Sequence, residues 1–412
     1  MNHEQAIEYL NNLLKIMLDK EASDLFISED FPPSIKVHGE MTAVSDQRLS
    51  STHTRAIAYA AMNDKQLAEF EEELECNFAI HPKDIGRFRV NIYQQQGHVG
   101  MVMRTITTDI PEFDSLKLPN ILKDVCMNKR GLLIVVGATG SGKSTSLAAM
   151  INHRNENTRG HIITIEDPVE YVHSNKNCLV TQREVGIDTK NWFSALKNTL
   201  RQAPDVILIG EIRDQETMEY AIAFAETGHL CMATLHASNT NQAMDRIINF
   251  FPEAKREQLL MDLSLNMKCI MSQRLVPTIG QKGRVAAIEI LINTPMVRSL
   301  IFKGHVHELK EQMQKGAKHG MCTFDQALFE LFESGKISIE DTLRNADSVN
   351  ELKLFIKLNS KRRDDLEDSS SKTDWCILGE VEEKKGDVDG PANFIRKNPV
   401  SADKLINPTG DE

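Results

Sequence analysis

The sequence predicts an α/β protein, with a small α+β domain in front of a larger core built on a largely parallel sheet. Between residues 131 and 235, strand-sized apolar runs alternate with helical segments; the runs are LLIVV, HIITI, VILIG and LCMATL. Near-continuous apolar strands separated by helices are typical of a parallel sheet covered on both faces. A glycine-rich loop follows the first run. Before residue 106 the predicted helices and strands are shorter, and apolar and polar side chains alternate along the last of them.

The first 105 residues mix helices with short strands, which predicts the α+β domain. Apolar residues recur at helical spacing over residues 1–18. Side chains alternate over residues 86–106, and Gly97 interrupts them as in a hairpin. The other predicted elements are strands around 25–28 and 34–38 and helices over 54–63, 64–73 and 118–126.

The remaining boundaries follow from changes in composition. We expect a linker over residues 106–117 and the core over 118–360, mostly helical after residue 253 but with a short strand near 285–289. Residues 361–412 are charged and rich in Ser, Gly and Pro, which predicts a disordered tail. The tail is either a solvated extension or a docking segment around Trp375–Leu378.

Composition limits the classes of protein. The chain has 412 residues, 41% of them hydrophobic, and a net charge of -11, so a protein that coats nucleic acid is not expected. The N-terminus has scattered acids and no long apolar core, and no run approaches the length of a membrane span. The seven cysteines form no C-x-x-C pair. Neither a disulfide framework nor a tetracysteine zinc site is expected, and we predict a cytoplasmic protein without direct membrane insertion.

The glycine-rich loop predicts a nucleotide site. Residues 137–144 match G-x-x-x-x-G-K-[ST], with a predicted strand before them and a helix after. Backbone amides of such a loop, together with the helix N-terminus, bind phosphate oxygens. Lys143 would reach the β- and γ-phosphates, Ser144 would ligate Mg²⁺, and Thr145 would lie near the α-phosphate. The predicted nucleotide-binding residues are Gly137, Ala138, Thr139, Gly140, Ser141, Gly142, Lys143, Ser144 and Thr145.

Three further polar side chains follow predicted core strands. Glu166 ends the HIITI strand, Glu211 follows VILIG, and His236 follows LCMATL. Because the carboxyl ends of parallel strands gather at one edge, we expect all three beside the loop. A carboxylate there can hold Mg²⁺ or orient the attacking water, and a histidine can donate to the γ-phosphate. Alternatively, each glutamate caps a helix, and the histidine is structural.

Arginines of the predicted hairpin are candidates for a further cation at the phosphates. Arg87 and Arg89 lie on the polar face of its first strand, and Arg104 lies near the end of its second. P-loop enzymes often need such a cation, frequently from another domain or subunit. A solvated strand face is the alternative.

Five blocks together resemble one family. They are ATGSGKSTSLAAMI, ITIEDPVEY, LRQAPDVILIGEIRD, AETGHLCMATLHASNTNQAMDRIINFFP and SQRLVP. They look like the GspE-like secretion and traffic ATPases of type II secretion and type IV pilus systems. The N-terminal ASDLFISEDFPPSIKVHGEM resembles the PAS-like domain of the pilus retraction branch, the PilT/PilU-like ATPases. Residues 296–303 correspond to the C-terminal AIRNLIRE-type motif of the PilT proteins, but they keep only its centre, and FK replaces the final RE. In this respect the chain resembles the PilU proteins more than the PilT proteins.

The resemblance implies a PAS-like domain followed by a RecA-like P-loop ATPase core, assembled as a homohexamer with ATP and Mg²⁺. Glu166 would activate water, Glu211 would support Mg²⁺ and water, and His236 would sense the γ-phosphate. It also implies a motor of pilus retraction and twitching motility, with a PilC-like inner-membrane platform protein and a PilT-like paralogue as partners. An accessory subunit, a related secretion ATPase and a RecA-like nucleic-acid motor are the alternatives; the last is disfavoured by the acidic charge.

Overall fold

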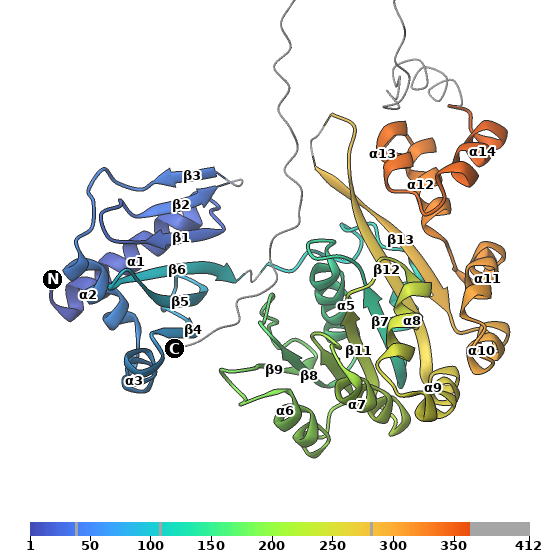
Figure 1. Cartoon of the computed structure of the whole chain (residues 1–412), viewed down its shortest axis with the longest axis horizontal. Helices are drawn as coiled ribbons and strands as arrows, with labels where there is room; N and C mark the ends of the chain where they lie inside the picture. The colour runs from blue at the N-terminus through green and yellow to red at the C-terminus, as the bar shows by residue number, and fades with distance from the viewer. Residues whose placement is uncertain (38–39, 107–108, 281–282, 363–412) are drawn as a thin grey trace, which may run out of the picture.

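The computed structural model describes residues 1–37, 40–106, 109–280 and 283–362. They form two lobes, each with its own sheet, joined by the segment after strand β6 (Figure 1). The predicted tail lies outside the described residues, except for Lys361 and Arg362. Within the described ranges, no helix combines the length and the apolarity needed to cross a bilayer.

The N-terminal lobe is the predicted α+β domain. Its antiparallel sheet has the order β3-β2-β1-β6-β5-β4. The hairpin prediction is confirmed, with Arg89 opposite Arg104 in the register of β5 and β6. Strands β3 and β4 were not predicted. The elements are α1 (His3–Asp19), β1 (Asp24–Ile27), β2 (Ser34–Val37), β3 (Glu40–Ala43), α2 (Ser51–Ala61), α3 (Asp64–Glu73), β4 (Glu75–Ile80), β5 (Arg87–Gln95) and β6 (His98–Ile106).

Local sequence explains the first helix. Asn2 accepts from the backbone N–H of Gln5, and the Gln5 side chain accepts from that of Asn2, which forms a capping box. Leu10, Leu14 and Met17 are buried on the face that packs into the domain core. The same periodicity that predicted the helix therefore positions it against the sheet.

The second lobe is the predicted parallel core. Its sheet has the order β13-β12-β7-β11-β10-β8-β9, and only β13 is antiparallel to its neighbour. Its first elements are α4 (Ile121–Cys126), β7 (Gly131–Val136), α5 (Lys143–Asn157), β8 (Gly160–Glu166), β9 (Cys178–Glu184), α6 (Trp192–Thr199), η1 (Leu200–Gln202), β10 (Val206–Ile209), α7 (Gln215–Glu226) and β11 (Leu230–Leu235).

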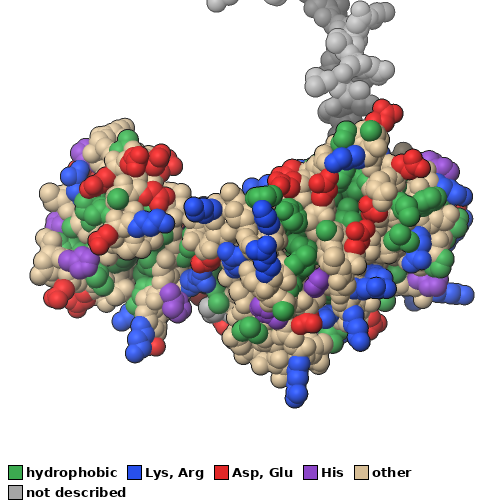
Figure 2. All heavy atoms as spheres, turned by 90° about the horizontal axis from the view of Figure 1, so that it is seen from below, with side chains coloured by type: hydrophobic (Ala, Val, Ile, Leu, Met, Phe, Trp, Pro, Cys, Tyr) green, Lys and Arg blue, Asp and Glu red, His purple; other side chains and the backbone are tan. Residues whose placement is uncertain are grey.

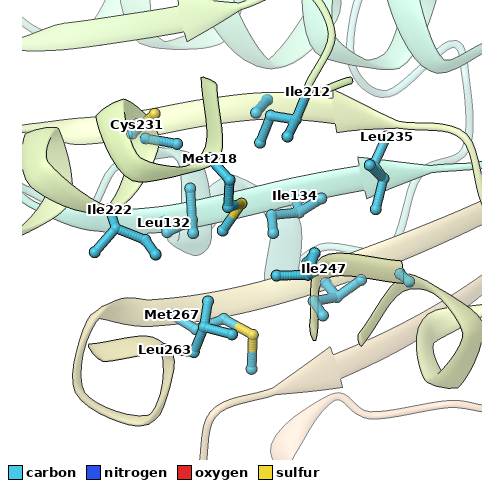
Figure 3. Packing of buried hydrophobic residues seen from close by; sticks show 14 of the residues in the cluster. Leu132, Ile134, Ile212, Met218, Ile222, Cys231, Leu235, Ile247, Leu263 and Met267 are labelled. Carbon is cyan, nitrogen blue, oxygen red and sulfur yellow. The ribbon is translucent and has the colours of Figure 1, made fainter. Parts of the chain in front are cut away.

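Apolar side chains on both faces of this sheet form the core. Leu132 and Ile134 of β7 belong to one cluster with Met218 of α7 and Met267 (Figure 3). The alternate residues Leu133 and Val135 belong to the cluster on the other face. Because successive side chains of a strand point to opposite faces, a strand buried on both must be continuously apolar, as β7 is.

The C-terminal part corrects one expectation. It is mostly helical, as expected, and the expected strand near 285–289 is part of β13, but β12 was not predicted, and the two long strands extend the sheet beyond β7. The apolar run of β12 continues directly from α9, and a short apolar run does not distinguish a buried strand from a buried helix. The elements are α8 (Thr240–Asn249), α9 (Glu253–Asn266), β12 (Met267–Pro277), β13 (Arg284–Ile292), α10 (Pro295–Phe302), η2 (Val306–Glu308), α11 (Leu309–Lys315), η3 (Ala317–His319), α12 (Phe324–Glu333), α13 (Ile339–Arg344) and α14 (Val349–Asn359).

Candidate functional site

The glycine-rich loop has the backbone expected of a phosphate cradle. It joins β7 to α5, and Gly137, Gly140 and Gly142 have positive φ values of 154°, 76° and 87°. A Cβ on Gly137 would lie 2.4 Å from the Ser141 hydroxyl oxygen, and one on Gly142 would lie 2.7 Å from an amide nitrogen of Gln273. Both the conformation and the close packing therefore require glycine at these two positions.

Lys143 is held over this loop. Its Nζ donates to the carbonyl oxygens of Gly137 at 2.8 Å and Ala138 at 3.0 Å. Burial lowers the pKa of Lys143, and the negative charge of Glu211 opposes that shift. Lys143, which is predicted to reach the phosphates, thus lies at the loop and interacts electrostatically with Glu211.

The three strand ends meet beside the loop, as predicted. Strands β11, β10 and β8 follow β7 in the sheet. Glu166 is the last residue of β8, whereas Glu211 and His236 lie just beyond β10 and β11. His236 Nε2 lies 3.3 Å from Glu211 Oε1. Residues that are far apart in the sequence thus form one cluster at the carboxyl edge of the sheet.

Glu166 lies in a pocket that reaches the loop. Ser144 of α5, Gly210 and Thr234 line the same pocket. Burial raises the pKa of Glu166 to about 7, although the Thr164 hydroxyl donates to its carboxylate at 2.6 Å and opposes the shift. A carboxylate whose pKa lies near neutral pH is suited to accept a proton from water.

Two residues that sequence reasoning missed position this cluster. Arg213 Nε donates to Glu211 Oε2 at 2.8 Å, and Arg213 lies 3.7 Å from the carboxylate of Asp167. Gln273 of β12 donates to the carbonyl oxygen of Ser141 at 2.9 Å and accepts from the Ser146 hydroxyl at 2.7 Å. Arg213 follows Glu211 by two residues, and Gln273 stands in the SQRLVP block. Those motifs were the available signals.

The candidate arginines are not gathered at the loop. Arg104 Nε pairs with Asp24 at 2.8 Å within the N-terminal lobe. Burial raises the pKa of Glu184, at the end of β9, while the charges of Arg89 and Arg87 lower it. The charges of Arg87 and Arg89 therefore act on a carboxylate of the core, which accepts from the Val169 backbone N–H at 3.1 Å. Figure 2 shows several Lys and Arg side chains near the junction of the lobes.

This geometry defines a P-loop nucleotide site, and comparison with known proteins gives its class. The model of the family "Type II/IV secretion system protein" matches residues 1–352. The chain therefore belongs to this family, and it is an ATPase of the PilT/PilU-like group.

Within this family, the chain is similar to the pilus ATPases PilU and PilT. The chain is 58% identical over 349 residues to the type IV pilus ATPase PilU of Pseudomonas aeruginosa, covering 85% of this chain and 91% of that protein. It is 41% identical over 337 residues to the pilus retraction ATPase PilT of the same bacterium, covering 82% and 98%. The crystal structure of the pilus retraction motor PilT with bound ADP superposes with a TM-score of 0.78 at 39% identity, covering 83% and 98%. The predicted position nearer PilU than PilT is confirmed.

Proposed function

We propose that this chain is a cytoplasmic, homohexameric ATPase motor of type IV pilus retraction. It would act on pili through a PilC-like inner-membrane platform protein, together with a PilT-like paralogue. The observation that carries the proposal is the meeting of Glu166, Glu211 and His236 beside the phosphate loop. Similarity to PilU and PilT supports the pilus as the machine that uses the energy.

The residues of the site support a direct hydrolysis step. Water would attack the γ-phosphorus of ATP, the bond from that phosphorus to the ADP oxygen would break, and Glu166 would take the proton of the water. Loop amides and Lys143 would neutralise charge on the phosphates. The Ser144 hydroxyl and Glu211 would hold Mg²⁺, which supplies further charge neutralisation; the hydroxyl and carboxylate oxygens are suitable donors for this ion. His236, beside Glu211, would donate to the γ-phosphate.

Motion would come from the two lobes. Burial raises the pKa of Glu184, which ends strand β9 of the core, and the charges of Arg87 and Arg89 already lower it. ATP binding would close the N-terminal lobe on the core and bring an arginine to the phosphates, and product release would reopen it. Arg104 belongs to the same hairpin and is the third candidate. The arginine could come from the same subunit or from its neighbour in the ring.

The experiment compares Lys143→Ala and Glu211→Gln with the control Lys318→Ala, which changes an exposed lysine away from the site. Hydrolysis by the purified proteins is measured, and retraction of labelled pili is imaged in cells. We expect both site variants to lose at least about 100-fold in hydrolysis, since each removes charge stabilisation at the phosphates. Wild-type hydrolysis in both variants would refute the assignment.

A second candidate is an accessory subunit that couples a paralogous ring to the platform, because PilU, the more similar of the two relatives, is named as a pilus ATPase, whereas PilT is named as the retraction ATPase. Its own hydrolysis would then be dispensable. Lys143→Ala expressed beside an active PilT-like paralogue separates the two functions. Preserved retraction indicates the accessory function, and lost retraction indicates the motor.

A further inference from the structure

Strand β12 sends two adjacent side chains to two different loops of the site. Gln273 is buried and holds the phosphate loop through Ser141 and Ser146. Arg274 donates from Nη2 to the carbonyl oxygen of Ser238 at 2.9 Å. Neighbouring residues of a strand point to opposite faces, so one strand can hold both loops at once. Ser238 lies only two residues after His236, which makes Arg274 a direct support of the His236 loop.

Arg274 also reaches the C-terminal helices. Its Nη1 donates to the carbonyl oxygen of Asn345 at 2.6 Å, and its Nη2 pairs with Asp347 Oδ1 at 2.6 Å. The guanidinium lies 3.9 Å from the ring centroid of Phe324, the first residue of α12. A planar group with several donors can satisfy these contacts together, which an ammonium group cannot do. One side chain thus connects the His236 loop, the segment between α13 and α14, and α12.

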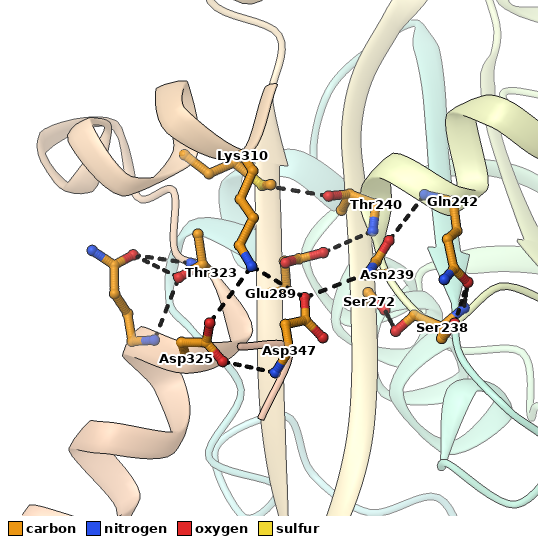
Figure 4. A network of polar contacts seen from close by, with 12 residues as sticks. Ser238, Asn239, Thr240, Gln242, Ser272, Glu289, Lys310, Thr323, Asp325 and Asp347 are labelled. Carbon is orange, nitrogen blue, oxygen red and sulfur yellow. Dashed lines mark hydrogen bonds and ion pairs between the residues drawn. The ribbon is translucent and has the colours of Figure 1, made fainter. Parts of the chain in front are cut away.

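A polar cluster fixes the partner of Arg274 (Figure 4). The Asp347 backbone N–H donates to Asp325 Oδ1 at 2.8 Å, and Lys310 Nζ lies 3.5 Å from Asp325 and 3.7 Å from Asp347. Asp347 also accepts from the Asn239 side chain at 3.5 Å. The carboxylate of Asp347 is largely buried between these groups. It is therefore held in place from several elements and can in turn fix Arg274.

The start of α8 is held from the same side. Asn239 caps this helix, and the backbone N–H of Thr240 donates to Glu289 Oε1 on β13 at 2.7 Å. Glu289 is buried, and its carboxylate meets the positive end of the helix. The loop that runs from His236 to α8 is consequently anchored at its end by β13 and near its middle by Arg274.

We propose that Arg274 is a positioning residue that holds His236 in register with Glu211 and couples this loop, through Asp347, to helices α12–α14. A shift of His236 on loss of the γ-phosphate would then displace Arg274 and Asp347, and through them the C-terminal helices, which lie far from the nucleotide. The inference rests on the proposed function, because it takes His236 as the residue that contacts the γ-phosphate. It adds a route by which loss of the contact between His236 and the γ-phosphate changes the structure of the C-terminal helices.

The test measures kcat, KM and ADP affinity for Arg274→Ala and Arg274→Lys, each alone and combined with His236→Ala. If Arg274 acts through His236, Arg274→Ala lowers kcat by about tenfold or more, as expected for a misplaced group, while ADP affinity changes less than about twofold. The same substitution then causes little further loss in the His236→Ala protein. Arg274→Lys restores little activity. Arg344→Ala, a change of an exposed arginine on α13, is the matched control.

Amide hydrogen exchange gives a second readout that does not depend on hydrolysis. Arg274→Ala should speed exchange both at residues 236–240 and at 345–347, and Asp347→Asn should speed it at the same two segments. An equal loss of kcat in both His236 backgrounds, or faster exchange at 345–347 alone, overturns the proposal. If Arg274→Ala speeds exchange at both segments but the wild-type protein has no ATPase activity, the proposed function is contradicted. The structural link between the two segments would still be established.

Discussion

Gln273 offers the sharpest test of how the phosphate loop is held. We predict that Gln273→Leu, which keeps a similar volume, loosens the loop and destabilises the core. Gln273 is 3% exposed and Ser146 is 2% exposed, so water cannot readily replace the two lost hydrogen bonds. The carbonyl oxygen of Ser141 and the hydroxyl of Ser146 would both lose a partner in the interior.

The magnitude follows from these two groups. Leaving a buried polar group without a partner costs about 1–3 kcal/mol, so two groups together cost roughly 2–4 kcal/mol when partial relaxation is allowed. For a domain of this size, 1 kcal/mol lowers Tm by about 2–4 °C. The expected decrease in Tm is therefore roughly 4–16 °C. Nucleotide affinity should also fall, because the amides of the loop lose their fixed arrangement.

Thermal unfolding followed by circular dichroism, with and without ADP, measures the first effect, and calorimetric titration of ADP measures the second. Gln258→Leu is the matched control, since Gln258 is exposed on α9 and its side chain donates to Asp262 of the same helix. Its change in unfolding free energy should stay within about 0.5 kcal/mol. If Gln273→Leu unfolds at the same temperature as Gln258→Leu and binds ADP equally well, the reasoning about the loop is wrong.

Two further predictions concern ionisable groups. Because burial raises the pKa of Glu166 to about 7, this carboxyl is protonated below that pH, so kcat/KM should rise with pH through about 7 and then level off. Glu166→Gln should abolish this rise along with most of the activity, and a wild-type profile that is flat well below pH 7 would contradict the role of Glu166. Arg104 is largely exposed, but its partner Asp24 is buried, so Arg104→Ala should cost about 1–3 kcal/mol of unfolding free energy in urea titrations. A large loss of hydrolysis by protein that is still folded would show that Arg104 reaches the phosphates, and an unchanged rate would leave Arg87 and Arg89 as the candidates.

Local patterns in the sequence sufficed for much of the fold and for the centre of the site. Continuous apolar runs identified β7, β8, β10 and β11, because strands buried on both faces tolerate few polar residues. The loop motif specified glycines where positive φ and close packing require them. The parallel sheet then placed Glu166, Glu211 and His236 together, since its strands all end at one edge.

Other features depended on contacts that no local pattern contains. Strand β12 was missed because its apolar run continues from α9, and only the ladder with β7 makes it a strand. Gln273 bonds to Ser146, 127 residues earlier, and Arg274 bonds to Asp347, 73 residues later. Arg87 and Arg89 were identified from the sequence as candidates, but the effect of their charges on Glu184, a residue of the other lobe, appears only in the tertiary structure.

The sequence alone thus determined the phosphate loop, the strand ends around it and the α/β class, because each follows from short-range periodicity and backbone geometry. Tertiary structure decided which side chains hold that loop and which carboxylate of the core the charges of Arg87 and Arg89 act on. It also decided how the His236 loop connects to the C-terminal helices. The physical reason is that hydrogen bonds and ion pairs between distant segments form only after the chain has brought them together. Their free energy depends on burial and geometry, which composition and spacing do not specify.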